Sequence, residues 1–187
     1  MKTRLTAPLV AIALLLLAGC GPPWRVVRQS GPPSALTGVQ LIGVSFDWSR
    51  ATVGGVPEAA YLGNLPPDEQ ANYMEVHNAI EAAYFTELQR QTVGVQVVPS
   101  TGAEPVQLVV QPLFLELGYY RVIVSRDSRL DVAAVFLVGG QPVDEIEVRT
   151  TRRASMRDPT VLNRMTDAAV VDAQLTSRFI RTARDGG

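Results

Sequence analysis

The only cysteine of this 187-residue chain, Cys20, and its only histidine, His77, are the residues whose types best suit nucleophilic, redox or metal chemistry. Cys20 follows two basic residues and an almost entirely apolar run from Ala7 to Ala18. This run is too short to span a hydrocarbon core, which needs about 20 helical residues, so it predicts an export signal. An exported lone thiol is liable to oxidise, which indicates that Cys20 is modified.

The residues Leu17-Ala18-Gly19-Cys20 resemble the lipobox of bacterial lipoproteins. In that family the cysteine thiol receives a diacylglycerol, the signal is cut before it and the new N-terminus is acylated. The resemblance implies a signal peptide over residues 1–19, a palmitate-type anchor on Cys20 and, because Gly21 rather than an aspartate follows, an outer-membrane location facing the periplasm. The alternative is an ordinary signal peptide followed by an unmodified cysteine.

His77 lies one helical turn before Glu81, so the two side chains can meet. A hydrolase would need His77 in a cleft beside a serine, and the sequence holds no Gly-x-Ser-x-Gly motif. The alternative is a surface or partly buried helix histidine. One histidine without a free thiol leaves only carboxylates as further zinc ligands, so we predict no catalytic residue, no metal and no cofactor.

Three carboxylates, Asp144, Glu145 and Glu147, lie close together at the start of an expected strand. A shared face for Glu145 and Glu147 would suit a hard cation or an acid–base pair. The alternative is a solvated strand face on which Arg149 neutralises the acids.

Two groups of residues are suited to contact a membrane or an anionic lipid, because indole rings and cations favour the headgroup layer. The alternatives are that the tryptophan packs back on the domain and that the later arginines pair with Asp158 and nearby acids. The first group lies near the N-terminus and the second around the last strand: Trp24, Arg25 and Arg28; Arg149, Arg152, Arg153 and Arg157.

The run from Leu113 to Tyr120 places apolar and aromatic residues on adjacent positions, so both faces of that segment are apolar. A strand covered by helices on one face needs only one apolar face, and the excess indicates either a partner surface or a bent core strand. The residues predicted to face a partner are Phe114, Leu117, Tyr119 and Tyr120.

Two Gly-Pro-Pro units predict that residues 20–35 form a semi-rigid tether, followed by one domain over residues 36–187. Alternation and β-branched residues predict strands, with Gly139-Gly140 as a hairpin turn. Apolar spacing predicts one helix from Pro66 to Arg90 and another that starts at Asp158 as its N-cap. The strands are expected over 37–46, 93–98, 106–116, 119–125, 129–138 and 143–151, with a long loop over 47–65.

This order of strand, helix, three or four strands and helix predicts an α+β fold, with an antiparallel sheet of about four or five strands and two helices packed on one face. On a lipobox protein of this size, the order resembles small periplasmic α+β envelope lipoproteins such as the auxiliary lipoproteins of ABC transporters.

The net charge of −1, which becomes more negative once the leader is removed, argues against a nucleic-acid partner. The favoured hypothesis is a membrane-anchored, non-enzymatic lipoprotein that interacts with another protein in a cell-envelope complex. The alternatives are a carrier or sensor for a lipid or small apolar ligand, and a hydrolase that uses His77.

Overall fold

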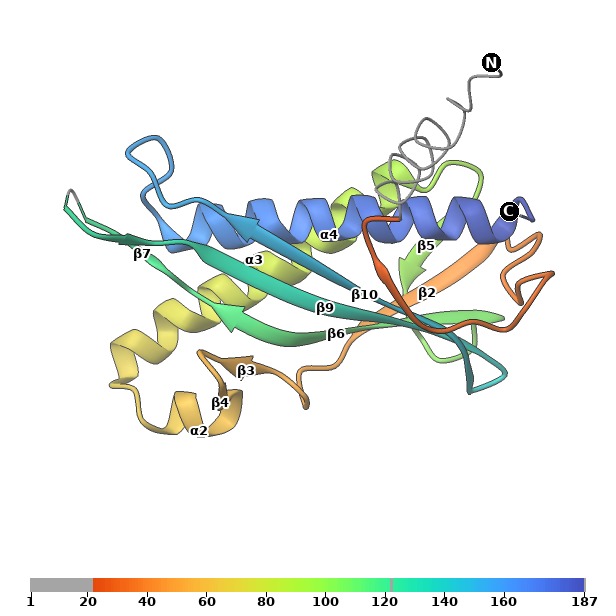
Figure 1. Ribbon diagram of the computed structural model, residues 1–187. Coiled ribbons are helices and arrows are strands. Elements are labelled where there is room, and N and C mark those ends of the chain that lie inside the picture. The colour runs from red at the N-terminus through yellow and green to blue at the C-terminus, as the bar shows by residue number, and fades with distance from the viewer. Residues whose placement is uncertain (1–21, 122, 187) are drawn as a thin grey trace, which may run out of the picture.

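A computed structural model describes residues 22–121 and 123–186 of this chain. Its main sheet has eight strands, and six of them run in the order β1-β10-β9-β6-β2-β5 (Figure 1). These six are β1 (Arg25–Arg28), β2 (Leu41–Phe46), β5 (Gln96–Pro99), β6 (Val106–Glu116), β9 (Ser128–Val138) and β10 (Gln141–Arg152). The short strands β3 (Thr52–Val53) and β4 (Val56–Pro57) pair with each other, and β3 also pairs with β6. A separate small hairpin joins β7 (Tyr119–Tyr120) and β8 (Ser125–Arg126). The described helices are α2 (Glu58–Gly63), α3 (Pro67–Gln91) and α4 (Val161–Arg184).

The sheet is mixed, so the expected antiparallel sheet of four or five strands is wrong. β2 runs parallel to both of its neighbours, β5 and β6, whereas β6, β9, β10 and β1 pair antiparallel. A parallel pair needs a long crossover connection, and α3 supplies it between β2 and β5. Alternation within a strand does not reveal the direction of its partners, which is why the sequence pattern left this pairing unseen.

Both long helices pack on the same side of the sheet, and together they bury its core (Figure 1). α3 contributes an apolar stripe that includes Ile80, Tyr84 and Leu88, each of which is fully buried. The buried stripe of α4 contains small alanines, which let this helix approach α3 and β10 closely. Phe136 of β9 meets Phe179 of α4 with ring centroids 5.5 Å apart.

Several segments differ from their expected boundaries. The segment expected to be a tether is described from Pro22 on, and its residues Arg25–Arg28 form the edge strand β1 beside β10. The expected loop over 47–65 contains β3, β4 and α2. The last helix is capped by Thr160, whose hydroxyl accepts a hydrogen bond from the Asn163 amide, and not by Asp158.

Candidate functional site

The His77 ring stacks on an aromatic ring and lies between two glutamates. Its ring stacks on Trp48 with centroids 3.7 Å apart. Nε2 lies 4.0 Å from Glu58 Oε1, and Nδ1 lies 4.0 Å from Glu81 Oε1. Glu81 in turn accepts a hydrogen bond from Trp48 Nε1 at 2.7 Å. Glu81 is therefore the helical neighbour expected from the sequence, while Trp48 and Glu58 come from the segment expected to be a loop.

This cluster joins the α2 segment to α3. Glu58 of α2 accepts a 2.7 Å hydrogen bond from the Tyr73 hydroxyl, and the ring of Tyr61 lies 5.5 Å from that of Tyr73. Burial, together with the hydrogen bond to Glu58, raises the pKa of Tyr73 above its usual range. A Tyr73 that stays protonated and donates to Glu58 holds two elements together, which is a structural role.

The three neighbouring carboxylates of β10 separate in space. Asp144 is fully buried and accepts hydrogen bonds from the Ser30 amide, the Ser30 hydroxyl and the Ser34 hydroxyl. Glu145 and Glu147 lie on the opposite, half-exposed face, where Glu147 pairs with Arg25 at 2.6 Å. Within the described ranges, no group of three or more histidine, cysteine, aspartate or glutamate side chains is placed to hold a metal ion.

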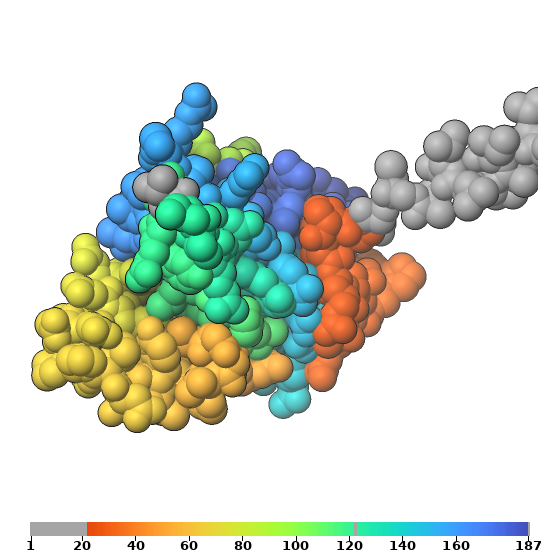
Figure 2. All heavy atoms as spheres, turned by 60° about the vertical axis from the view of Figure 1, so that its left-hand side comes forward, coloured from red at the N-terminus to blue at the C-terminus, as the bar shows by residue number. Residues whose placement is uncertain are grey.

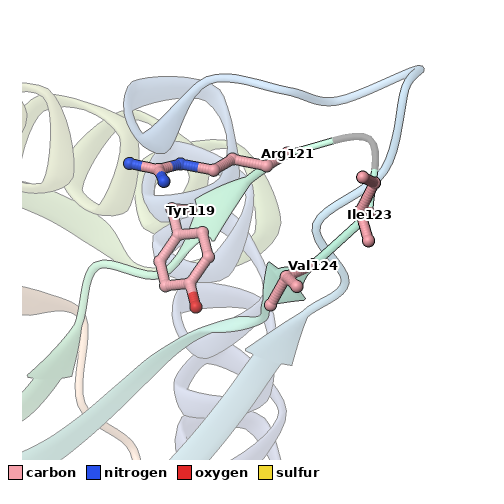
Figure 3. A pocket seen from close by; sticks show the side chains of 4 residues that line it. All are labelled: Tyr119, Arg121, Ile123 and Val124. Atoms are coloured by element: carbon pink, nitrogen blue, oxygen red, sulfur yellow. The ribbon is translucent and has the colours of Figure 1, made fainter.

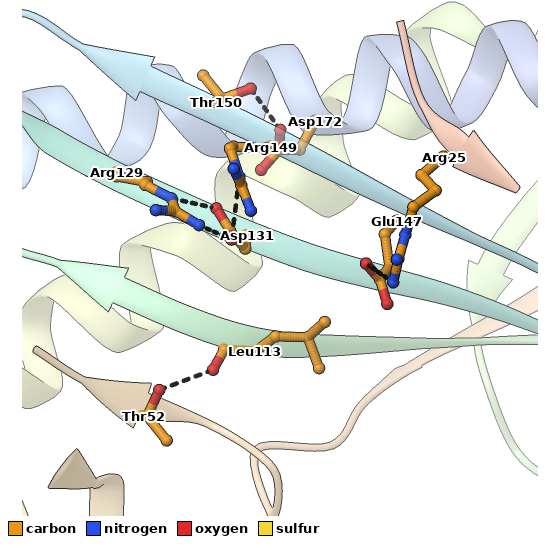
Figure 4. A network of polar contacts seen from close by, with 9 residues as sticks. All are labelled: Arg25, Thr52, Leu113, Arg129, Asp131, Glu147, Arg149, Thr150 and Asp172. Carbon is orange, nitrogen blue, oxygen red and sulfur yellow. Dashed lines mark hydrogen bonds and ion pairs between the residues drawn. The ribbon is translucent and has the colours of Figure 1, made fainter. Parts of the chain in front are cut away.

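The side of the sheet away from α3 and α4 carries ion pairs that run across neighbouring strands (Figure 4). Asp131 of β9 accepts from Arg129 Nε at 2.7 Å and from Arg149 Nε of β10 at 3.3 Å. Between these charges lies an apolar strip formed by Val109, Val135 and Leu137, with Gln107 and Gln111 beside it on β6. We call the residues of this side the sheet face: Gln107, Val109, Gln111, Leu113, Phe114, Arg129, Asp131, Ala133, Val135, Leu137, Glu145, Glu147 and Arg149, of which Ala133 is fully buried.

A β-bulge explains the adjacent apolar residues of β6. Its register shifts between Pro112 and Phe114, so that Leu113 and Phe114 are both half-exposed while Leu115 is fully buried. The guanidinium of Arg129 lies 4.8 Å from the centroid of the Phe114 ring and covers part of it. The run therefore serves both the core and the sheet face.

The four residues predicted to face a partner do not form one surface. Phe114 belongs to the sheet face, and Leu117 packs against the core. Tyr119 is exposed on β7, and Tyr120 is half-exposed beside it. Only Tyr119 and Tyr120 lie together, on the small hairpin at the far end of the sheet (Figure 1).

This hairpin and the loop between β10 and α4 lie at one end of the molecule (Figure 2), and both carry strongly exposed apolar side chains. Ile123 is 94% exposed and Met156 is 77% exposed. Tyr119, Arg121, Ile123 and Val124 line an open pocket in which Arg121 lies over the Tyr119 ring, 5.8 Å from its centroid (Figure 3). We call the residues of these two segments the tip surface: Tyr119, Arg121, Ile123, Val124, Arg153, Met156 and Arg157.

A fully buried arginine holds the two segments of the tip surface together. Arg164, in the first turn of α4, donates to Ser128 Oγ at 2.8 Å and to the Asp158 carbonyl at 2.9 Å. The Ser128 hydroxyl in turn donates a hydrogen bond to the Leu117 carbonyl at 2.6 Å. Each contact joins a different segment, so Arg164 links the end of β6, the start of β9 and the loop before α4.

Gly118 allows the two arms of this hairpin to approach each other closely at its base. Its φ is +64°, and a Cβ at this position would lie 2.4 Å from the Arg126 carbonyl oxygen. Only glycine adopts this conformation and this closeness without strain.

The residues predicted to contact a membrane are dispersed. Trp24 packs edge-on against Phe179 with centroids 6.0 Å apart, and Arg28 donates to the Pro142 carbonyl. Arg152 donates to the Asp167 carbonyl, while Arg153 and Arg157 are exposed on the tip surface. Cys20 and the expected signal peptide lie outside the described residues.

Sequence reasoning missed Arg164, Ile123 and Asp172. A helical arginine has the same sequence signature whether it is buried or exposed, so nothing singled out Arg164. Asp172 is fully buried in α4 and accepts from Thr150 Oγ1 at 2.5 Å behind the sheet face (Figure 4). The available signal for Ile123 was the run Arg121–Val124, in which apolar residues follow an arginine within an expected strand.

In the part of the chain that the structure describes, no helix is both long enough and apolar enough to cross a membrane.

Comparison with known proteins yields structural likeness alone. No family model matches this chain, and no curated protein matches it in sequence. The PelC dodecamer from Paraburkholderia phytofirmans is 12% identical, with 82% of this chain and 97% of that chain covered and a TM-score of 0.44. A point variant of the same dodecamer is 15% identical, with coverage of 81% and 97% and a TM-score of 0.45. A structure described as an uncharacterized protein is 9% identical, with coverage of 81% and 95% and a TM-score of 0.38. The chain is thus similar in outline to these proteins, and likeness at this level carries nothing about what it binds.

Proposed function

We propose that this chain is a lipid-anchored, periplasm-facing protein of the cell envelope that binds another envelope protein through its sheet face. The proposed anchor is Cys20, on the strength of the lipobox-like residues 17–20. The lipid would hold the protein at the membrane and leave the domain free to bind a partner.

The observation that carries the proposal is the apolar strip of the sheet face. Val109 and Val135 are direct cross-strand partners on β6 and β9, and Leu137 follows two residues later on the same side. An uncovered face of a sheet normally carries polar residues at such positions. An apolar centre bordered by charged residues is instead the composition of a protein interface.

The charges that border the strip are positioned before any partner arrives. Arg25 pairs with Glu147, and Asp131 is held between Arg129 and Arg149. Paired arginines lose less side-chain freedom on binding, which lowers the entropic cost of an interface.

Photo-crosslinking in cells tests the sheet face. We would place a crosslinking amino acid at Val135, and a control at Met74, which is 38% exposed on α3. The proposal expects one discrete protein adduct at Val135 that Arg149→Glu abolishes, and no such adduct at Met74. Equal adducts at both positions would contradict it.

The anchor is tested separately. Cys20→Ser is expected to abolish labelling by a fatty-acid probe and to leave the protein unprocessed or released. Unchanged labelling and membrane retention in this variant would show that the lipid is elsewhere or absent.

A further inference from the structure

We infer that the tip surface binds the anionic surface of a phospholipid membrane and thereby gives the domain a second attachment point. This contact is distinct from the partner-binding sheet face. Its geometry rests on the proposed anchor at Cys20.

The apolar side chains of the tip surface protrude into solvent, and the pocket that Tyr119, Ile123 and Val124 line together with Arg121 is open. Ile123 is 94%, Met156 77%, Val124 55% and Tyr119 44% exposed. Protruding apolar and aromatic side chains of this kind insert into the boundary between headgroups and acyl chains, which has no fixed shape to match. A folded protein partner would favour a flatter, partly buried patch such as the sheet face.

The charges around these side chains complement an anionic surface. In a chain with a net charge of −1, the two segments that build this end hold more basic than acidic residues. The basic residues are Arg121, Arg126, Arg152, Arg153 and Arg157, and the acidic ones are Glu116, Asp127 and Asp158. Glu116 is engaged by Arg126 at 2.6 Å, and Asp127 accepts from the Ala154 amide at 3.0 Å. Arginine near an anionic bilayer adds attraction that falls off within a Debye length.

The two segments are fixed relative to each other, so they would meet a membrane as one surface. Arg164 bonds Asp158 of the loop and Ser128, the first residue of β9 after the hairpin, and the Asp127 carboxylate links the hairpin to the loop through Ala154. Because these contacts form within the free protein, contact with lipid need not order the segments first.

The length of chain before the domain keeps the membrane within reach. Trp24 is four positions after Cys20 in the sequence, and four steps of extended chain span at most about 14 Å. Trp24 packs on Phe179 in the C-terminal part of α4, whereas the tip surface lies at the start of that helix. The 18 residues between Val161 and Phe179 correspond to about 27 Å of helix. Attachment at both places would lay α4 along the membrane.

The test measures how deeply single positions enter lipid in the full-length protein. Vesicles of phosphatidylethanolamine and phosphatidylglycerol, with brominated acyl chains as quencher, would carry the protein labelled with a thiol-reactive fluorophore at Ile123→Cys. The matched control is Val56→Cys, because Val56 is 42% exposed on β4, on the side of the sheet away from α4 (Figure 1). We expect strong quenching at position 123 and little at position 56.

Charge reversal and a change of lipid composition separate the contribution of charge to vesicle binding from that of the apolar side chains. Vesicle affinity measured on the unanchored Cys20→Ser chain without its leader is expected to fall about five-fold for each of Arg153→Glu and Arg157→Glu, the size expected for one arginine near an anionic surface. Phosphatidylcholine vesicles should bind more weakly, and free inorganic phosphate should not compete at equal ionic strength. Competition by phosphate would show a headgroup-sized anion site and overturn the membrane surface as the ligand.

Equal quenching at positions 123 and 56 would overturn the inference, and would favour a protein as the occupant of the tip surface. The proposed lipid anchor is tested independently by thiol labelling of the unsubstituted protein. If Cys20 is lipidated, this protein has no free thiol to label. A wild-type chain that labels contradicts the proposed anchor, whereas binding of the leaderless Cys20→Ser chain to anionic vesicles would still support the tip surface.

Discussion

The tip surface and the sheet face both expose apolar residues beside arginines, yet they differ in how those residues are held. On the sheet face Arg25 and Arg149 are ion-paired, and the apolar side chains are half-buried between neighbours. On the tip surface Ile123 is almost wholly exposed, and Arg121 lies over a tyrosine ring. The first arrangement suits a partner of fixed shape, and the second suits a fluid surface that adapts to protruding side chains.

The two regions also differ in what supports them from behind. The tip surface depends on the fully buried guanidinium of Arg164. Behind the sheet face, Thr150 of β10 donates to the buried carboxyl of Asp172. A change of pH that titrates Asp172 should therefore alter the support of the sheet face.

The largest effect is expected from Arg164→Met, which removes the buried guanidinium beneath the tip surface. This substitution removes the buried guanidinium that donates to the Asp158 carbonyl and to the Ser128 hydroxyl, and the free energy of unfolding should fall by about 3 kcal/mol. Hydrogen exchange should accelerate in the hairpin and in the loop before α4, while amides of β9 and β10 at the sheet face change little. The control, Arg153→Met, alters an exposed arginine of the same end and should change stability by less than about 0.5 kcal/mol. Uniform exchange across the domain would contradict a local role for Arg164.

A pH-dependent effect is expected from Asp172→Asn. Burial raises the pKa of Asp172 well above its usual range, against the opposing effect of the Thr150 hydrogen bond. The folded state then holds a proton that the unfolded state releases above about pH 4, so stability contributed by this group falls as pH rises from there toward the folded pKa. Asparagine keeps an acceptor for Thr150 and should flatten this decline in denaturation curves. Asp167→Asn, at an exposed position of the same helix, should leave the slope unaltered.

A smaller effect on stability is expected at the ion pairs of the sheet face. Arg149 has a side chain that is 67% exposed, and Arg149→Ala should lower the free energy of unfolding by less than about 1 kcal/mol. The same substitution should reduce crosslinking from Val135, because the sheet face loses a charge that the partner would contact at the border of the strip. A loss of crosslinking without loss of stability would sharpen the distinction between holding the fold and binding a partner.

The smallest effect on stability is expected at Ile123. Since its side chain already lies in water, Ile123→Ser should change the free energy of unfolding by less than about 0.5 kcal/mol. Leu137→Ser, which removes a half-buried side chain of the sheet face, should cost about 1 kcal/mol. Thermal unfolding of the pair measures this contrast, and an equal loss would mean that Ile123 packs against the domain.

The sequence predicted those elements whose signals are local. The alternation in β10 places Ile146, Val148 and Thr150 inward, and Gly139-Gly140 turns the chain between β9 and β10. The helix over Pro67–Gln91 was likewise evident from its apolar spacing. Each of these patterns needs only neighbouring residues.

Features that depend on distant partners were not predictable in this way. The parallel place of β2 between β5 and β6 follows from how α3 closes the crossover, which leaves no mark on the alternation of β2 itself. The sites behaved similarly: His77 with Glu81 was foreseen from helical spacing, whereas Trp48 and Glu58 reach His77 from a segment with no periodic pattern. Arg164 is buried only because three separate segments end beside it.

The short edge strand β1 has a mechanical consequence. Any force applied to residues before Arg25 enters the domain through four residues that pair only with β10 on one side of the sheet. A pull along the strand loads these hydrogen bonds together with the Arg25–Glu147 contact, whereas a pull away from the sheet edge opens them one after another. Resistance to extraction should therefore depend on the direction of the load, and Trp24 against Phe179 is the first contact to yield in either case.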